Sequence, residues 1–299
     1  MKLLDKGYDL FWNKIIKSAD EKRMSKQTLP EGVSAILDIP YIDDGKVEHL
    51  LDIYFPEGAK EKLPVIIDMH GGGLMYGYKE LNKNYCYHLV KRGFAVINIS
   101  YSLSPQNAFP VHIKDAMAAL EWIGKNIDSY PICDKNNVFI TGDSGGGLLA
   151  AYCCLIATSE ELQKAFGVNK PDLFFRAAGF TSGMFYYEIG IAKFLIPGIF
   201  GKGGMKKSAY KDYIQLEDIF DKGAFPPSYM VTSTQDFIHD STTKFKAFLD
   251  SKGVKNEMDD FGINPDHKLE HVFSVGYPSE YEESVQTIDH MTDFFRAHM

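Results

Sequence analysis

Apolar runs rich in β-branched residues alternate along this chain with stretches whose apolar positions recur at helical spacing. Such alternation is typical of a mostly parallel sheet that is covered by helices on both faces. The first two runs are predicted to form an antiparallel opening pair. The predicted strands are Ser34–Ile39, Glu48–Phe55, Pro64–Met69, Ala95–Ile99, Val138–Thr141, Arg176–Thr181, Tyr229–Ser233 and Asn256–Phe261. The predicted helices are Lys79–Arg92, Val111–Asn126, Gly147–Ser159, Ser241–Lys252 and Ser279–His298.

Two segments depart from this alternation. Residues 184–215 place aromatic residues, aliphatic residues and glycines between two predicted strands, where a crossover needs only one helix. Lids are inserted outside the strand ends where ligands bind, so we expect a lid here. Its apolar run Phe194–Phe200 is expected to close a pocket and set the size of the substrate, with core packing as the alternative. Residues 1–26 are predicted to form a docking helix, because they lack the continuous apolar core of a signal peptide.

Composition is consistent with one large domain. The chain has 299 residues, of which 45% are apolar, and we expect residues 1–299 to form one domain with cap elements at about 1–30 and 184–215. The net charge of −8 argues against nucleic acid and acidic membranes as partners. No apolar run reaches the length of a membrane span, so we expect no integral membrane association and a cytoplasmic location. The oligomeric state stays open, a homo-oligomer included. The four cysteines lack metal-ligand spacing and are expected to be buried free thiols.

A glycine-flanked serine follows one of the predicted strands. Gly142-Asp143-Ser144-Gly145-Gly146 leads directly into a small, apolar, helix-like segment. A serine on a tight strand-to-helix turn needs neighbours almost without side chains two residues before and two after it, which Gly142 and Gly146 provide. The same five letters occur in all-β proteases, but there the histidine and aspartate precede the serine. Here more than half of the chain follows Ser144 and contains candidates for both partners.

A second glycine motif, His70-Gly71-Gly72-Gly73, follows the predicted strand Pro64–Met69. Acyl transfer to a serine develops negative charge on the carbonyl oxygen, and backbone N–H groups can reach that oxygen only from a loop without obstructing side chains. The expected donors are the amides of Gly72, Gly73 and Gly145. A plain glycine turn is the alternative.

Candidates for the acid and the base both follow Ser144. Asp236 and Asp240 come after the predicted strand Tyr229–Ser233, and an N-terminal helix cap is the alternative role for Asp240. His267 and His271 lie in the loop after the last predicted strand, and periodicity does not separate them.

A third segment makes a family resemblance specific. Tyr101-Ser102-Leu103-Ser104-Pro105, with Phe109-Pro110 and Asp115 further on, is similar to the YRLAPE…FP…D segment of hormone-sensitive-lipase-like esterases. With the two glycine motifs, the chain resembles this family of α/β-hydrolases over most of its length. Ser102 stands where the family has arginine, Gln106 where it has glutamate, and Gly145 where alanine is common. The first two differences raise the question of what supports this loop, whereas the third retains the oxyanion N–H.

The resemblance implies the α/β-hydrolase fold, with a mostly parallel sheet and a lid. It also implies a Ser-Asp-His triad with no metal and no cofactor. Asp236 then matches the first aspartate of the family's D-P-L-x-D segment, and His271 matches its H-x-F segment, so Ser144, Asp236 and His271 are the expected triad. His70 is expected to orient the glycine loop rather than to act as the base.

The expected substrate is a small-molecule ester with a small or medium acyl group. A peptidase or amidase of the same fold is the alternative enzyme, and a non-catalytic ligand receptor is the alternative outside catalysis. Aromatic residues that could wall an apolar pocket, and that fit the core equally well, are Tyr76, Phe109, Phe185, Tyr186 and Phe194.

Overall fold

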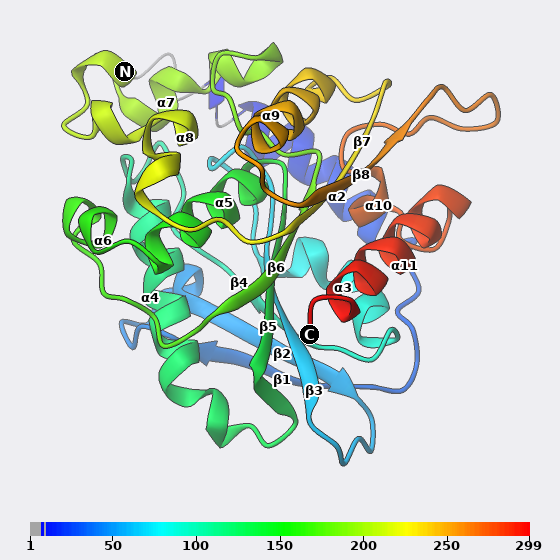
Figure 1. Cartoon of the computed structure of the whole chain (residues 1–299). Helices are drawn as coiled ribbons and strands as arrows, with labels where there is room; N and C mark the ends of the chain where they lie inside the picture. The colour runs from blue at the N-terminus through cyan, green and yellow to red at the C-terminus, as the bar shows by residue number, and fades with distance from the viewer. Residues whose placement is uncertain (1–6, 9) are drawn as a thin grey trace.

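One twisted sheet organises the molecule (Figure 1). The computed structural model describes residues 7–8 and 10–299, and within them eight strands pair in the order β1-β2-β4-β3-β5-β6-β7-β8. Strand β2 is antiparallel to β1 and to β4, and all other neighbours are parallel, as the alternation predicted. The strands are β1 (Val33–Pro40), β2 (Leu50–Pro56), β3 (Leu63–Met69), β4 (Ala95–Ile99), β5 (Cys133–Asp143), β6 (Phe175–Thr181), β7 (Ser228–Ser233) and β8 (Asn256–Phe261).

Helices cover both faces of this sheet. Figure 1 shows α3 and α11 on one side and α4 and α6 on the other. The alternation of side chains along a strand divides the core accordingly: in β3, Val65 and Ile67 pack on the α4 side, whereas Ile66 packs on the α3 side. The helices are α2 (Lys17–Met24), α3 (Lys83–Val90), α4 (Val111–Asn126), α5 (Gly145–Ala157), α6 (Glu160–Phe166), α7 (Ile196–Phe200), α8 (Leu216–Ile219), α9 (His239–Ser251), α10 (Phe273–Gly276) and α11 (Glu282–Arg296).

The boundaries of β4, β8 and α4 agree with the prediction, and others differ for local reasons. Strand β5 begins at Cys133 rather than Val138, because its polar first residues pair with the start of β3 before the register shifts. Helix α5 begins at Gly145, directly after the serine, and the predicted helix Lys79–Arg92 is split into a 3₁₀ turn and α3. All four cysteines are buried and free, as expected.

The two segments outside the alternation lie next to each other at one end of the sheet. Residues 10–24 form a π-helical segment, Leu10–Ile16, that continues into α2. The hydroxyl of Tyr8 donates to the carbonyl oxygen of Phe194 in the inserted segment, and Arg23 and Gln27 donate to the carbonyl oxygen of Gly276. No helix in the described part of the chain is both long enough and apolar enough to cross a membrane.

Candidate active site

Ser144 occupies the turn between β5 and α5. Its φ of +50° lies in the left-handed region that few side chains adopt. A β-carbon on Gly142 would collide with the backbone of Gly146, and one on Gly146 would collide with the carbonyl oxygens of Met69 and His70. These two glycines therefore allow the turn to close against β3, which leaves the serine side chain at the carboxyl end of the sheet.

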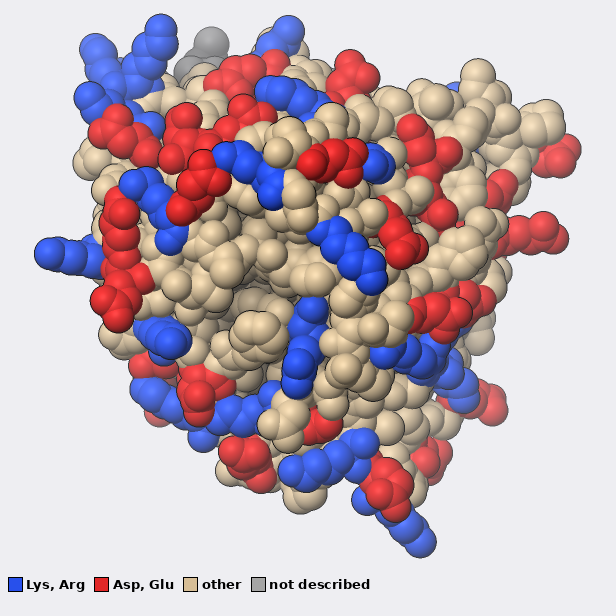
Figure 2. Space-filling view, in the orientation of Figure 1, with Lys and Arg blue, Asp and Glu red and all other residues tan. Residues whose placement is uncertain are grey.

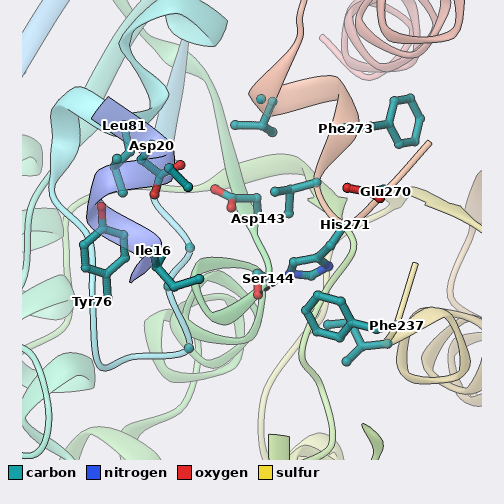
Figure 3. Close-up of a pocket in the computed structure, with 18 of the residues that line it drawn as sticks. Ile16, Asp20, Tyr76, Leu81, Asp143, Ser144, Phe237, Glu270, His271 and Phe273 are labelled. Atoms are coloured by element: carbon teal, nitrogen blue, oxygen red, sulfur yellow. Dashed lines mark hydrogen bonds between the residues drawn. The ribbon is translucent and has the colours of Figure 1, made fainter. Parts of the chain in front are cut away.

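The structure brings Ser144, His271 and Asp236 together. Figure 3 shows the imidazole of His271 beside Ser144. Nε2 of His271 lies 2.9 Å from Oγ of Ser144, and Nδ1 lies 2.9 and 3.1 Å from the two carboxylate oxygens of Asp236. The three residues follow β5, β8 and β7, whose carboxyl ends meet at one edge of the parallel sheet. Such contacts are those of a serine, a general base and a carboxylate that orients the base.

The Asp236 carboxylate is ionised in this environment. Burial opposes its charge, but the hydrogen bond and the electrostatic interaction with His271 outweigh burial and hold the pKa of Asp236 below its usual value. The backbone N–H of Ile238 also donates to it at 2.9 Å. Val272, directly after the histidine, has a φ of +54°, so the loop reverses sharply where it presents the imidazole.

The competing candidates lie elsewhere. His267 contacts the carboxylate of Glu283 at 3.0 Å and stacks on Tyr281, away from the serine. The Asp240 side chain is 88% exposed. The alternative role for Asp240, an N-terminal helix cap, is wrong, because α9 begins at His239 and places Asp240 within the first turn. A carboxylate there still interacts favourably with the helix dipole.

The glycine loop reaches over the serine turn. The amides of Gly72 and Gly73 donate to no protein oxygen within the described residues, and the Gly145 amide, as the first of α5, has no acceptor within the helix. A β-carbon on Gly145 would lie 3.0 Å from the Gly73 nitrogen, so the two backbones approach closely. Free N–H groups converging beside a serine are suited to stabilising an oxyanion.

His70 supports this loop from behind. Its Nδ1 lies 2.8 Å from the Gly71 carbonyl oxygen, and its ring stacks on Tyr101 with centroids 4.3 Å apart. Burial lowers the pKa of His70 to about 4, so the ring is neutral near pH 7. The hydroxyl of Tyr101 donates to the His70 carbonyl oxygen at 2.6 Å. These contacts fit an orienting role and keep His70 away from the serine.

The question raised by Ser102 is answered by a residue directly before β2, His49. The backbone N–H of Ser102 donates to Asp115 at 3.0 Å, and Nε2 of the buried His49 lies 3.3 Å from the same carboxylate. Nδ1 of His49 lies 3.0 Å from Asp44. An imidazole thus stands beside Asp115, where the family has an arginine. His49 directly precedes β2, and its position in the sequence gives no sign of this contact.

Two further carboxylates lie behind the glycine loop. Nδ2 of Asn82 donates to Asp68 and to Asp143 at 2.8 Å each, and all three side chains are buried. Burial and the nearby charge of Asp143 raise the pKa of Asp68 to about 7. Asp143 also accepts a hydrogen bond from the Gly71 amide. Asp68 and Asn82 were not predicted from the sequence, because nothing in their spacing connects them with Ser144.

A cavity of about 550 Å³ opens beside Ser144. Its walls come from residues 11–23, from the glycine loop and from residues 268–281. Apolar side chains from Trp12, Ile16 and Leu195 line it together with the charged pair of Asp20 and Arg23. Within the described residues, no cluster of three or more histidine, cysteine, aspartate or glutamate side chains could hold a metal ion.

Of the five aromatic candidates for the pocket wall, only Tyr76 lines this cavity. Phe109 is buried against Phe200, and Phe185 stacks on Phe245 in the core. Tyr186 donates to Glu217 in α8, and Phe194 points outward with 67% of its surface exposed. The expectation for these four was therefore wrong, because aromatic content does not distinguish a core side chain from a pocket side chain.

Known proteins resemble this chain in sequence. A family model described as BD-FAE matches residues 51–174. Carboxylesterase NlhH of Mycobacterium tuberculosis is 24% identical over 238 residues, which cover 72% of this chain and 69% of that protein. Arylacetamide deacetylase of Bos taurus is 37% identical over 108 residues, or 33% of this chain and 26% of that protein.

Solved structures resemble the whole chain. Esterase B of Lactobacillus rhamnosis, inhibited by a tributyrin phosphonate, has a TM-score of 0.91 and 26% identity, with 99% of this chain and 96% of that chain covered. A bacterial heroin esterase shares the fold, with a TM-score of 0.70 and 19% identity. The matched region covers 95% of this chain and 90% of that chain. The chain has the α/β-hydrolase fold, resembles hormone-sensitive-lipase-like esterases in sequence and structure, and is a carboxylesterase-like hydrolase.

Proposed function

We propose that this chain hydrolyses carboxylic esters of small-molecule alcohols through an acyl-enzyme on Ser144, with Asp236 and His271 completing a catalytic triad. The observation that carries the proposal is the position of His271, whose two nitrogens contact the serine and the buried carboxylate at 2.9 Å each. An imidazole held in this way can remove the serine proton while its other N–H stays fixed.

The reaction follows from these roles. His271 takes the proton from Oγ of Ser144, and the oxygen attacks the ester carbonyl to give a tetrahedral oxyanion. The amides of Gly72, Gly73 and Gly145 stabilise that charge. His271 then protonates the leaving alcohol, and the acyl group stays on Ser144. Water that gives its proton to His271 attacks the acyl-enzyme, releases the acid and restores the serine.

The size of the cavity supports the proposal that the acyl group of the substrate is small or medium. Its volume of about 550 Å³ lies within the range of sites for small ligands, and Leu195 contacts the glycine loop so closely that a β-carbon on Gly73 would collide with it. We propose that residues 10–24 and the inserted segment form the cap of one domain, because both contribute walls to this cavity.

Hydrolysis rates for nitrophenyl esters of increasing acyl length, measured beside anilides and peptides, test the proposal. We expect kcat/KM to favour the esters, and Ser144→Ala to reduce their hydrolysis by about 10⁴-fold or more. Faster cleavage of anilides or peptides would indicate the amidase alternative. Binding without turnover would indicate a receptor, and a Ser144→Ala variant within tenfold of wild type would remove the serine from the mechanism.

A further inference from the structure

The inserted segment carries a local positive charge in an acidic protein. Residues 189–211, between Glu188 and Asp212, contain five lysines and neither aspartate nor glutamate, although the whole chain has a net charge of −8. All five are exposed, and none forms an ion pair within the described residues. In the space-filling view, basic side chains project at the upper left, over the region of α7, above a band of acidic side chains (Figure 2). These five lysines, together with Lys14, are called the basic rim: Lys14, Lys193, Lys202, Lys206, Lys207 and Lys211.

Exposed apolar side chains accompany the basic rim. Phe194 is 67% exposed, with the ammonium group of Lys193 5.4 Å from its ring centroid. The π-helical segment exposes Leu10 and Ile15 by 53% and 56%, and Lys14 lies between them in sequence. The hydrogen bond from Tyr8 to Phe194, at 2.9 Å, joins the two segments. The two segments that carry the exposed apolar groups and the cations are therefore in contact.

This surface borders the active-site cavity. Phe11, 39% exposed, lines the cavity from the π-helical segment, and Ala192 and Leu195 line it on either side of Lys193 and Phe194. A substrate held against the basic rim would thus lie beside the entrance to Ser144.

We propose that the basic rim and its apolar side chains dock this protein on the surface of an anionic lipid membrane. Clustered lysines are attracted to anionic headgroups, and exposed Phe, Leu and Ile side chains gain from insertion at the boundary between headgroups and acyl chains. The acidic remainder of the protein, repelled by such a surface, would orient the molecule with the cavity toward the lipid. Docking does not require catalysis, but delivery of lipid-dissolved esters to the cavity rests on the proposed function.

Sedimentation of the full-length protein with lipid vesicles tests this proposal. We expect the protein to sediment with vesicles of phosphatidylcholine containing about one-third phosphatidylglycerol, and to bind pure phosphatidylcholine at least about tenfold more weakly. Raising the salt concentration from about 0.05 to about 0.5 M should release it. Lys206→Glu with Lys207→Glu should weaken binding to the anionic vesicles at least about tenfold.

Matched variants at the opposite end of the sheet provide the controls. Lys60→Glu with Lys62→Glu makes the same change of charge in the exposed turn between β2 and β3, and should leave binding unchanged. Phe194→Ser should weaken binding, whereas Phe174→Ser, at a residue 65% exposed before β6, should not. Hydrolysis of a water-soluble ester should be the same in both lysine pairs, which separates docking from catalysis. The proposal would be overturned if the protein did not bind vesicles, if it bound both lipid compositions equally, or if the control variants lost as much binding as the test variants. An acidic protein would then be the partner to examine.

Discussion

At the scale of single residues, the proposed chemistry depends on the two contacts of one imidazole. His271→Ala removes the base, and Asp236→Asn leaves a side chain that cannot stabilise the charged imidazole, so each should reduce kcat by about 10⁴-fold. His267→Ala and Asp240→Asn should stay within about tenfold of wild type, because their side chains lie away from Ser144. Steady-state kinetics on a nitrophenyl ester measures all four. An inactive His267→Ala beside an active His271→Ala would exchange the two assignments.

Asp68 gives a prediction about stability. Its pKa of about 7 in the folded protein exceeds the unfolded value of about 3.9, so the folded state holds an extra proton between these limits. The free energy of unfolding should therefore lose a contribution from this group as pH rises from about 4 to about 7. Asp68→Asn removes that loss. The free energy of unfolding of the variant minus that of wild type should therefore rise by about 2 kcal/mol when the pH is raised from about 5 to about 7.

Urea unfolding of both proteins at the two pH values measures this difference. Titrating groups that do not interact with Asp68 cancel in the comparison, since both proteins contain them in the same surroundings. Parallel pH dependences would show that Asp68 does not hold the extra proton, and would place that proton elsewhere in the pair of carboxylates linked by Asn82.

At the scale of secondary-structure elements, the inserted segment contributes to the cavity through Leu195 rather than through its exposed aromatic ring. Leu195→Ala enlarges the space beside Gly73, so the ratio of kcat/KM for a longer ester to that for an acetate should rise about tenfold. Phe194→Ala is the matched control and should leave the ratio within about twofold. Equal shifts in the two variants, or none in Leu195→Ala, would mean that chain-length selection lies in another wall.

The regular elements were predictable because their patterns are local. Strand β4 and helix α4 have the predicted bounds, since β-branched runs and helical spacing carry the information within a few residues. The short helices of the insertion were not predicted. They form where the segment packs on the domain, as Phe200 does against Phe109, and such tertiary contacts are absent from local periodicity.

At the scale of the whole molecule, the site assembles segments that are far apart in sequence. Sequence motifs predicted the positions of Ser144 and the glycine loop. The family resemblance selected Asp236 and His271, and the structure brings these two residues into contact with each other and with Ser144. The cavity wall from residues 11–23 and the loop support from His49 depend on which surfaces meet after folding. The basic rim was not predicted either, because a net charge of −8 does not show how the charges are distributed over the surface.

Covalent labelling tests the central claim most directly. An alkyl phosphonate with a nitrophenyl leaving group should react once per protein chain, releasing one nitrophenolate as the serine oxygen bonds to phosphorus. Peptide mass mapping should locate the adduct on Ser144, hydrolysis of esters should be lost in proportion to labelling, and Ser144→Ala should remain unlabelled. An adduct on another residue, or ester hydrolysis that survives complete labelling, would contradict the proposed acyl-enzyme on Ser144.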